Sequence, residues 1–291
     1  MTLVVAFPYG TKDRSALHLA GVLARSSGDS LRIVSVVPAP SRSPIPTGRD
    51  LQFAAWSRQR GDKAVAEARQ AVAEICPDVR SEALYVASRS KAKALLDEAV
   101  ASDAAMIIVG SGTDGGIGRI SVSSTADRLL HSSPVPVALA PRGYRADGDA
   151  RVTRVTCAFR GDPASHDVLA RTTRISEEVG AQLRVATFGI EGQNVAPFEH
   201  DEQARRIEYE EQVKSVQTAA LEVVTAEQSR PAEEVVGTGR TWTAALDSLD
   251  WVPTEVLVVG SSSEGGATRL FLGSNASRII RHTPVPVVLV P

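Results

Sequence analysis

The feature that most constrains the fold of this chain is an internal repeat of domain size. Residues 110–141 read GSGTDGGIGRISVSSTADRLLHSSPVPVALAP, and residues 260–291 read GSSSEGGATRLFLGSNASRIIRHTPVPVVLVP. The two segments align without a gap at an offset of 150 and are identical at 14 of 32 positions. Further upstream the match continues at an offset of 152, as from Leu17 to Leu169. A period of this length indicates a duplicated domain rather than a solenoid repeat.

The repeat divides the 291 residues into two copies joined by a short connection. We expect one domain over residues 1–141, a linker over residues 142–151 and a second domain over residues 152–291. The linker, RGYRADGDAR, is polar and contains two glycines, which is typical of a connecting segment.

Each copy alternates apolar runs of strand length with amphipathic segments of helical period. Copy one is expected to form strands at 3–7, 31–37, 84–86, 106–109 and 135–140, and helices at 13–26, 51–75, 90–101 and 123–131. Copy two is expected to form strands at 152–159, 183–188, 235–236, 256–259 and 285–290, and helices at 165–179, 201–227, 241–249 and 273–281. This alternation predicts an α/β fold in which each copy is a five-stranded parallel sheet with helices on both faces.

Composition narrows the class of protein further. Lys and Arg number 32 against 34 Asp and Glu, a net charge of −2 that gives no support to a nucleic-acid binder. No apolar run is long enough to span a membrane, and the first residues carry no basic leader region. Two cysteines exclude a disulfide framework, and the five histidines lack the spacing of a metal site. We therefore expect a cytoplasmic protein without metal, membrane or nucleic-acid partners.

The segment after the fourth strand of copy two has the properties of an anion site. Glycines in 260–266 let the backbone turn sharply and let a ligand approach, and residues 273–275 open the next helix. The free N–H groups of a helix start favour a phosphate. The alternative is that residues 273–275 only cap the helix. The residues expected around phosphates are Gly260, Ser261, Ser263, Gly265, Gly266, Arg269, Gly273, Ser274 and Asn275.

With a glycine-rich loop followed by a Pro-Val-Pro-Val strand in both copies, the whole chain resembles a tandem universal stress protein. The resemblance implies two Rossmann-like domains of strand order 3-2-1-4-5, similar to the adenine nucleotide alpha hydrolase-like folds. Family domains pair through the fifth strand, so the resemblance implies an intramolecular pseudo-dimer here and leaves a further homodimer open. Some members bind ATP through a G-x2-G-x9-G-S/T motif, an aspartate after the first strand and a hydrophobic residue on the second.

Copy two matches this motif better than copy one does. Gly260 and Gly273-Ser274 match, whereas Ser263 stands at the second glycine and Arg160 at the aspartate. Phe188 stands at the hydrophobic position and either stacks on an adenine or fills its space. The resemblance thus implies ATP or another adenine nucleotide in domain 2, with Arg160 contacting phosphate in place of the acid.

Copy one departs further from the motif. Thr113 and Ser123 replace its two later glycines, and Pro8 replaces the aspartate. Domain 1 is therefore the less favoured nucleotide site.

Three functions follow from these observations. The leading hypothesis is a non-enzymatic stress-response protein with a regulatory or protective role. The second is an interaction scaffold that has lost nucleotide binding. The third is a weak ATP hydrolase, ranked last because the sequence contains no phosphate-loop or nucleophile-elbow motif and no catalytic constellation.

Overall fold

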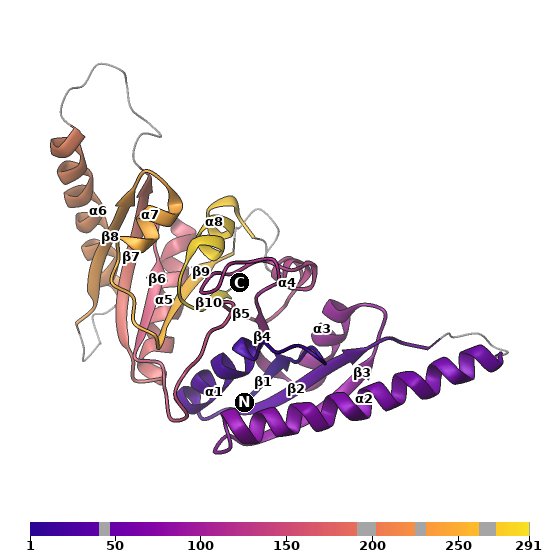
Figure 1. The fold of residues 1–291 in the computed structure, drawn as a ribbon. Helices are drawn as coiled ribbons and strands as arrows, with labels where there is room; N and C mark the ends of the chain where they lie inside the picture. The colour runs from indigo at the N-terminus through magenta and orange to yellow at the C-terminus, as the bar shows by residue number, and fades with distance from the viewer. Residues whose placement is uncertain (41–46, 191–201, 225–230, 262–271, 291) are drawn as a thin grey trace. The chain divides into compact units, whose positions relative to one another are not determined.

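The structure is a computed structural model that describes residues 1–40, 47–190, 202–224, 231–261 and 272–290. The chain folds into two units, unit 1 over Met1–Arg151 and unit 2 over Val152–Pro291, and each is an α/β domain (Figure 1).

Unit 1 is a parallel sheet with the strand order β3-β2-β1-β4-β5. Its elements in chain order are β1 (Thr2–Ala6), α1 (Ser15–Ser27), β2 (Ser30–Val37), α2 (Gly48–Ile75), β3 (Ser81–Ala87), α3 (Lys91–Ala101), β4 (Ala104–Gly110), α4 (Ser124–Leu130) and β5 (Val137–Ala140).

Unit 2 repeats this arrangement as a parallel sheet with the order β8-β7-β6-β9-β10. Its elements are β6 (Arg154–Ala158), α5 (Pro163–Glu178), β7 (Gln182–Ile190), α6 (Glu202–Val224), β8 (Glu233–Gly239), α7 (Trp242–Asp247), β9 (Glu255–Gly260), α8 (Ser274–His282) and β10 (Val287–Val290). The predicted α/β class and the implied order 3-2-1-4-5 are thus confirmed within each unit. Pairing of the fifth strands concerns the placement of one unit against the other, and it stays a prediction.

Element boundaries differ from the predicted ones where capping chemistry or strand position decides them. Helix α2 begins at Gly48 because Thr47 and Asp50 form a reciprocal capping box. Helix α5 begins at Pro163 because the Asp162 side chain accepts a hydrogen bond from the Ser165 N–H. The outer strands β3 and β8 are longer than predicted because their half-exposed ends lack the apolar run that marks a buried strand.

The central strands are buried on both faces, as a parallel sheet requires. Val4, Val5, Ile107 and Ile108 have essentially no exposed surface. Helix α2 presents small residues to the sheet, and Gly61 lies so close to the Tyr85 ring that an added Cβ would be 2.5 Å from it. Small residues on this helix face therefore let α2 approach the sheet closely.

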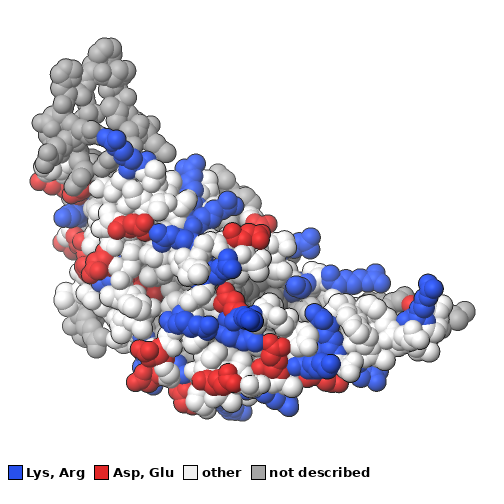
Figure 2. Space-filling view, viewed as in Figure 1, with Lys and Arg blue, Asp and Glu red and all other residues white. Residues whose placement is uncertain are grey.

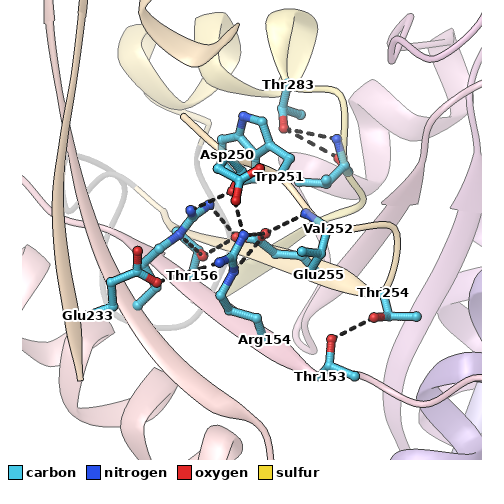
Figure 3. A network of polar contacts seen from close by, with 12 residues as sticks. Thr153, Arg154, Thr156, Glu233, Asp250, Trp251, Val252, Thr254, Glu255 and Thr283 are labelled. Carbon is cyan, nitrogen blue, oxygen red and sulfur yellow. Dashed lines mark hydrogen bonds and ion pairs between the residues drawn. The ribbon is translucent and has the colours of Figure 1, made fainter. Parts of the chain in front are cut away.

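Unit 2 holds a buried ionic network at the amino ends of its strands (Figure 3). The Glu255 carboxylate, which is 0% exposed, accepts hydrogen bonds from Arg184 at 2.5 Å and from Arg154 at 2.7 Å. Thr156 also donates its hydroxyl to Glu255, and the two guanidinium groups donate to the carbonyl oxygen of Asp250. Arg184 lies 4.7 Å from the centre of the Trp251 ring. The network joins β6, β7 and β9 to the turn that precedes β9.

We expect Glu255→Ala to destabilise the protein by about 3–5 kcal/mol, because two buried guanidinium groups lose their common counter-ion. Chemical denaturation measures the effect. The control is Asp97→Ala, which breaks the exposed Lys93–Asp97 pair and should change the free energy of unfolding by less than about 1 kcal/mol. Equal effects of the two substitutions would contradict this account.

The segment that follows β5 packs against helix α1 of its own unit. Arg145 Nη1 lies 2.9 Å from His18 Nε2, and the Ala146 N–H donates to His18 Nδ1 at 3.4 Å. Burial and the Arg145 charge lower the pKa of His18, with Arg25 acting in the same direction and Asp13 opposing it. The neutral imidazole accepts one of these two N–H groups at its unprotonated nitrogen, whereas the protonated ring accepts neither, so the neutral form is the one that holds this segment on α1.

Because the pKa of His18 is lower in the folded than in the unfolded state, its contribution to stability is present above the unfolded pKa, about 6.5, and is lost as pH falls. We expect wild type to lose stability relative to His18→Gln between pH 7.5 and 5, as measured by denaturation at each pH. Parallel pH curves for the two proteins would contradict this expectation.

Candidate functional site

The candidate site of unit 2 lies where its central strands reach their carboxyl ends, the edge at which open α/β sheets bind ligands. Gly260 ends β9, and the Ser261 N–H donates to the Val290 carbonyl oxygen at 2.9 Å. The Ser261 N–H therefore extends the sheet and is not available to a ligand. Four of the predicted site residues lie outside the described residues: Ser263, Gly265, Gly266 and Arg269.

Helix α8 begins at this edge without a side-chain cap. Gly273 is its N-cap residue with φ −68° and ψ 163°, and its carbonyl accepts the Ser277 N–H at 2.9 Å. Among the described residues, the N-cap position provides no side-chain acceptor for the first turn, which includes the predicted residues Ser274 and Asn275. A helix start of this kind leaves N–H groups and the positive end of the helix dipole for an anion.

The equivalent helix start in unit 1 is capped by its own side chain. Ser123 is the N-cap of α4, and its hydroxyl accepts the Ala126 N–H at 3.2 Å. The two copies differ at the N-cap, which is Ser123 in unit 1 and Gly273 in unit 2. This difference decides whether the N-cap side chain accepts a hydrogen bond from a backbone N–H of the first turn.

The loop that precedes α4 in unit 1 folds back on itself. The Gly112 N–H donates to the Ser121 carbonyl at 2.7 Å, and the Ser121 N–H donates to Ser111 Oγ at 2.8 Å. Arg142 donates to the carbonyl oxygens of Thr113 and Gly115 at 2.8 and 2.6 Å. Loop groups that would face a ligand are thus used within the loop. Sequence reasoning placed Arg142 in the linker and missed this contact, because only the folded chain brings it to the loop.

The turn after β1 in unit 1 is also occupied by internal contacts. Glu67 on α2 accepts from Arg14 at 2.5 Å and from the Gly10 N–H at 3.3 Å. The Arg14 guanidinium lies 4.5 Å from the centre of the Phe7 ring. Pro8, at the position of the family aspartate, is exposed beside this cluster. No sequence signal linked Glu67 to this turn, since 53 residues separate it from Arg14.

Arg160 stands at the matching turn of unit 2 and is exposed. Its Nη2 atom lies 2.7 Å from Asp162 Oδ2, and 62% of its side chain is accessible. Asp162 is itself the N-cap of α5. An exposed guanidinium in this place is available to an anion, although Asp162 competes for it.

Phe188 lies on β7 opposite Gly237 of β8, with its ring half-buried. A Cβ at Gly237 would lie 3.0 Å from the Phe188 ring and 2.4 Å from the carbonyl oxygen of Ala245 on α7. One side of the ring therefore fills the space that Gly237 leaves between β8 and α7.

Gly260 has a packing role in addition to any contact with a ligand. A Cβ there would lie 2.4 Å from Val168 Cγ2 on α5, whereas at the equivalent Gly110 the nearest atom is Ala16 Cβ at 3.8 Å. The glycine of copy two is thus required by the larger helix residue.

Within the residues that the structure describes, no cluster of three or more His, Cys, Asp or Glu side chains is placed to hold a metal ion. In the same part of the chain, no helix has both the length and the apolar character needed to cross a bilayer.

Two parallel sheets of the same strand order, each with its loops at the carboxyl edge, define a tandem α/β protein with two Rossmann-like domains. The universal stress protein family model matches residues 1–141 and 151–291. The chain belongs to the universal stress protein family, which confirms the resemblance noted from the sequence.

Individual similar proteins match either the whole chain or about half of it. A universal stress protein of Mycobacterium tuberculosis strain H37Rv is 35% identical over 309 residues, covering 100% of both chains. The crystal structure of a universal stress protein from Archaeoglobus fulgidus covers 99% of this chain and 97% of its own, with a TM-score of 0.61 at 16% identity, a likeness of fold. Another structure from Archaeoglobus fulgidus, a universal stress protein in complex with dAMP, covers 48% of this chain and 97% of its own, with a TM-score of 0.32 and 21% identity.

We expect Gly260→Ala to destabilise the protein by about 1–3 kcal/mol, because the new methyl group overlaps a β-branched side chain that has one preferred rotamer in a helix. Gly110→Ala is the matched control and should be nearly neutral. The double variant Gly260→Ala/Val168→Ala recreates the Ala16–Gly110 spacing and should recover part of the loss. Thermal and chemical denaturation provide the measurement, and a non-destabilising Gly260→Ala would contradict the packing role.

Proposed function

We propose that this universal stress protein is a non-enzymatic, cytoplasmic stress-response module that binds ATP or another adenine nucleotide in unit 2. The observation that carries the proposal is the difference between the two helix starts. Helix α8 has no side-chain cap, whereas Ser123 satisfies the first turn of α4. A phosphate supplies the acceptor that α8 lacks.

The surroundings of α8 support a nucleotide rather than a free anion. Arg160 is an exposed cation at the neighbouring strand end, and Phe188 offers a half-buried ring farther along the same edge. Together they provide a contact for phosphate and a flat apolar contact for a base. Adenine is the base to test first, because a universal stress protein of Archaeoglobus fulgidus has been solved with dAMP.

The role of unit 1 in this proposal is structural. Its loop is closed by Ser111, Ser121 and Arg142, so it does not offer the groups that unit 2 offers. We propose that the fifth strands of the two units pair within the chain, as domains of this family do. Unit 1 then supports the nucleotide-binding unit as its internal partner.

The second candidate function is an interaction scaffold without nucleotide. It is favoured by the closed loop of unit 1 and by the Arg160–Asp162 ion pair, which gives that guanidinium a partner inside the chain. In this case α8 is capped by water, and the carboxyl edges serve protein contacts.

Substitutions at the two N-caps distinguish the candidates. Gly273 has backbone angles that any residue adopts, so Gly273→Asp caps α8 with a carboxylate that excludes phosphate. Gly273→Asn is the neutral isostere, and Ser123→Asp is the matched change in unit 1. We expect Gly273→Asp to weaken binding of ATP by about tenfold or more, Gly273→Asn to weaken it less, and Ser123→Asp to leave it unchanged. Calorimetric titration with ATP, ADP and dAMP measures the affinities, and adenosine serves as the ligand without phosphate.

The same preparation is first denatured, and any released nucleotide is quantified per chain. About one adenine nucleotide per chain, or saturable binding in titration, supports the nucleotide proposal. Absence of both at millimolar ligand overturns it in favour of the scaffold. A loss of binding in Ser123→Asp with none in Gly273→Asp overturns the assignment to unit 2.

A further inference from the structure

The outer edge of unit 1 carries a groove between α2 and the edge strand β3. Two adjoining hollows of about 420 and 440 Å³ run along it, and both are lined by Arg69. The groove has α2 residues Asp62, Val65, Ala66 and Arg69 on one side and β3 residues 81–85 on the other. We call it the α2–β3 groove. Figure 1 shows α2 running beside β3, at the end of the sheet order.

Hydrogen bonding identifies which residues of β3 face the open edge. The Leu31 N–H donates to the Arg80 carbonyl, and the Ser88 N–H donates to the Val37 carbonyl, both at 2.9 Å. Since backbone groups alternate in direction along a strand, the even-numbered residues of β3 face β2. The residues facing outward are Ser81, Ala83, Tyr85 and Ala87, and within the described chain none of their backbone groups has a hydrogen-bond partner.

Strand β3 lacks the usual protection of an edge. Its sequence, SEALYVA, contains no proline and no lysine, and its only charged residue, Glu82, is paired with Arg32 at 2.6 Å. An unprotected edge strand is a template for another strand.

The charges of α2 over the groove are self-complementary. Asp62 and Arg69 are both exposed and seven residues apart, two helical turns, so they lie on the same side of α2. Neither side chain has an ion-pair partner among the residues that the structure describes. The small residues Val65 and Ala66 lie midway between them. A two-fold axis at this midpoint places each Asp62 opposite the partner's Arg69.

The same axis fits the strand. Antiparallel pairing about Leu84 sets Ala83 opposite the partner's Tyr85, and Ser81 opposite the partner's Ala87. All of these are outward-facing residues, so every free N–H and C=O group of the edge gains a partner. One of the two hollows is lined by Asp62, Val65, Ala66, Arg69, Leu84 and Tyr85, so the centre of the strand and the centre of the helix pattern lie at the same level.

We propose that the α2–β3 groove is a homodimer interface, in which β3 pairs antiparallel with β3 of a second copy of this chain and the Asp62 and Arg69 side chains form reciprocal ion pairs. The surface is separate from the candidate nucleotide site in unit 2, and it does not depend on nucleotide binding. It joins two copies of this chain through an edge other than the fifth strands.

A charge-swap series on the full chain tests the ion pairs, with sedimentation velocity over the micromolar range as the measurement. We expect wild type to dimerise, and Asp62→Arg or Arg69→Asp to raise the dimer dissociation constant by about tenfold or more, because like charges then face each other. The double variant Asp62→Arg/Arg69→Asp restores opposite charges and should restore the dimer. Lys63→Asp, which makes the same change in charge as Arg69→Asp at a position outside the groove, should leave the dimer intact.

A backbone variant tests the strand pairing independently. Ala83→Pro removes one outward N–H group while leaving the bonds to β2 in place, as proline is tolerated on an edge strand. We expect loss of the dimer with an unchanged circular dichroism spectrum. A monomeric wild type overturns the proposal and leaves the edge for an extended segment of another protein. A dimer that survives both Asp62→Arg and Ala83→Pro also overturns it, because its interface then lies elsewhere.

Discussion

The structure of each unit depends on one constraint, which is that a parallel sheet has to be covered by helices on both faces. The central strands are apolar on both sides, as Val4, Val5, Ile107 and Ile108 illustrate in unit 1. Connections between such strands have to cross a face of the sheet, so every loop that follows a strand lies at the carboxyl edge. The candidate site, the glycine contacts and the free helix start of α8 are all consequences of this arrangement.

The two copies solve the same packing problem with different residues. At the carboxyl edge, copy one combines Gly110 with Ala16, whereas copy two combines Gly260 with Val168. At the amino ends of the strands, unit 2 buries a carboxylate between two guanidinium groups (Figure 3). In unit 1 the residue equivalent to Arg184 is Arg32, which pairs with Glu82 and Glu98 at a more exposed position. Duplication has thus kept the fold, while the charges inside it have diverged.

Charge on the surface is mixed, as expected from a net charge near zero. On the face drawn in Figure 2, basic and acidic side chains are interspersed. The arrangement of charged side chains at particular edges of the sheets therefore matters more for recognition than the net charge does. Asp62 and Arg69 are an example. Each is a single exposed charge, and only their spacing over the edge strand makes the pair complementary to the same pair on a second copy. The exposed Arg160 is another, since it follows β6, the strand that pairs with β9 ahead of the uncapped α8.

The sequence by itself determined the duplication, the α/β class and nearly every strand and helix, because apolar periodicity and repeat identity are local properties of the chain. It also predicted a candidate site at the carboxyl edge of the sheet, since glycines after a buried strand mark that edge in any parallel fold. Only the tertiary structure decided that Arg142 closes the loop of unit 1, that Glu67 holds the turn after β1, and that Gly260 is required by Val168. These contacts join residues far apart in the chain, and their energies depend on distances of a few ångströms that no local pattern encodes.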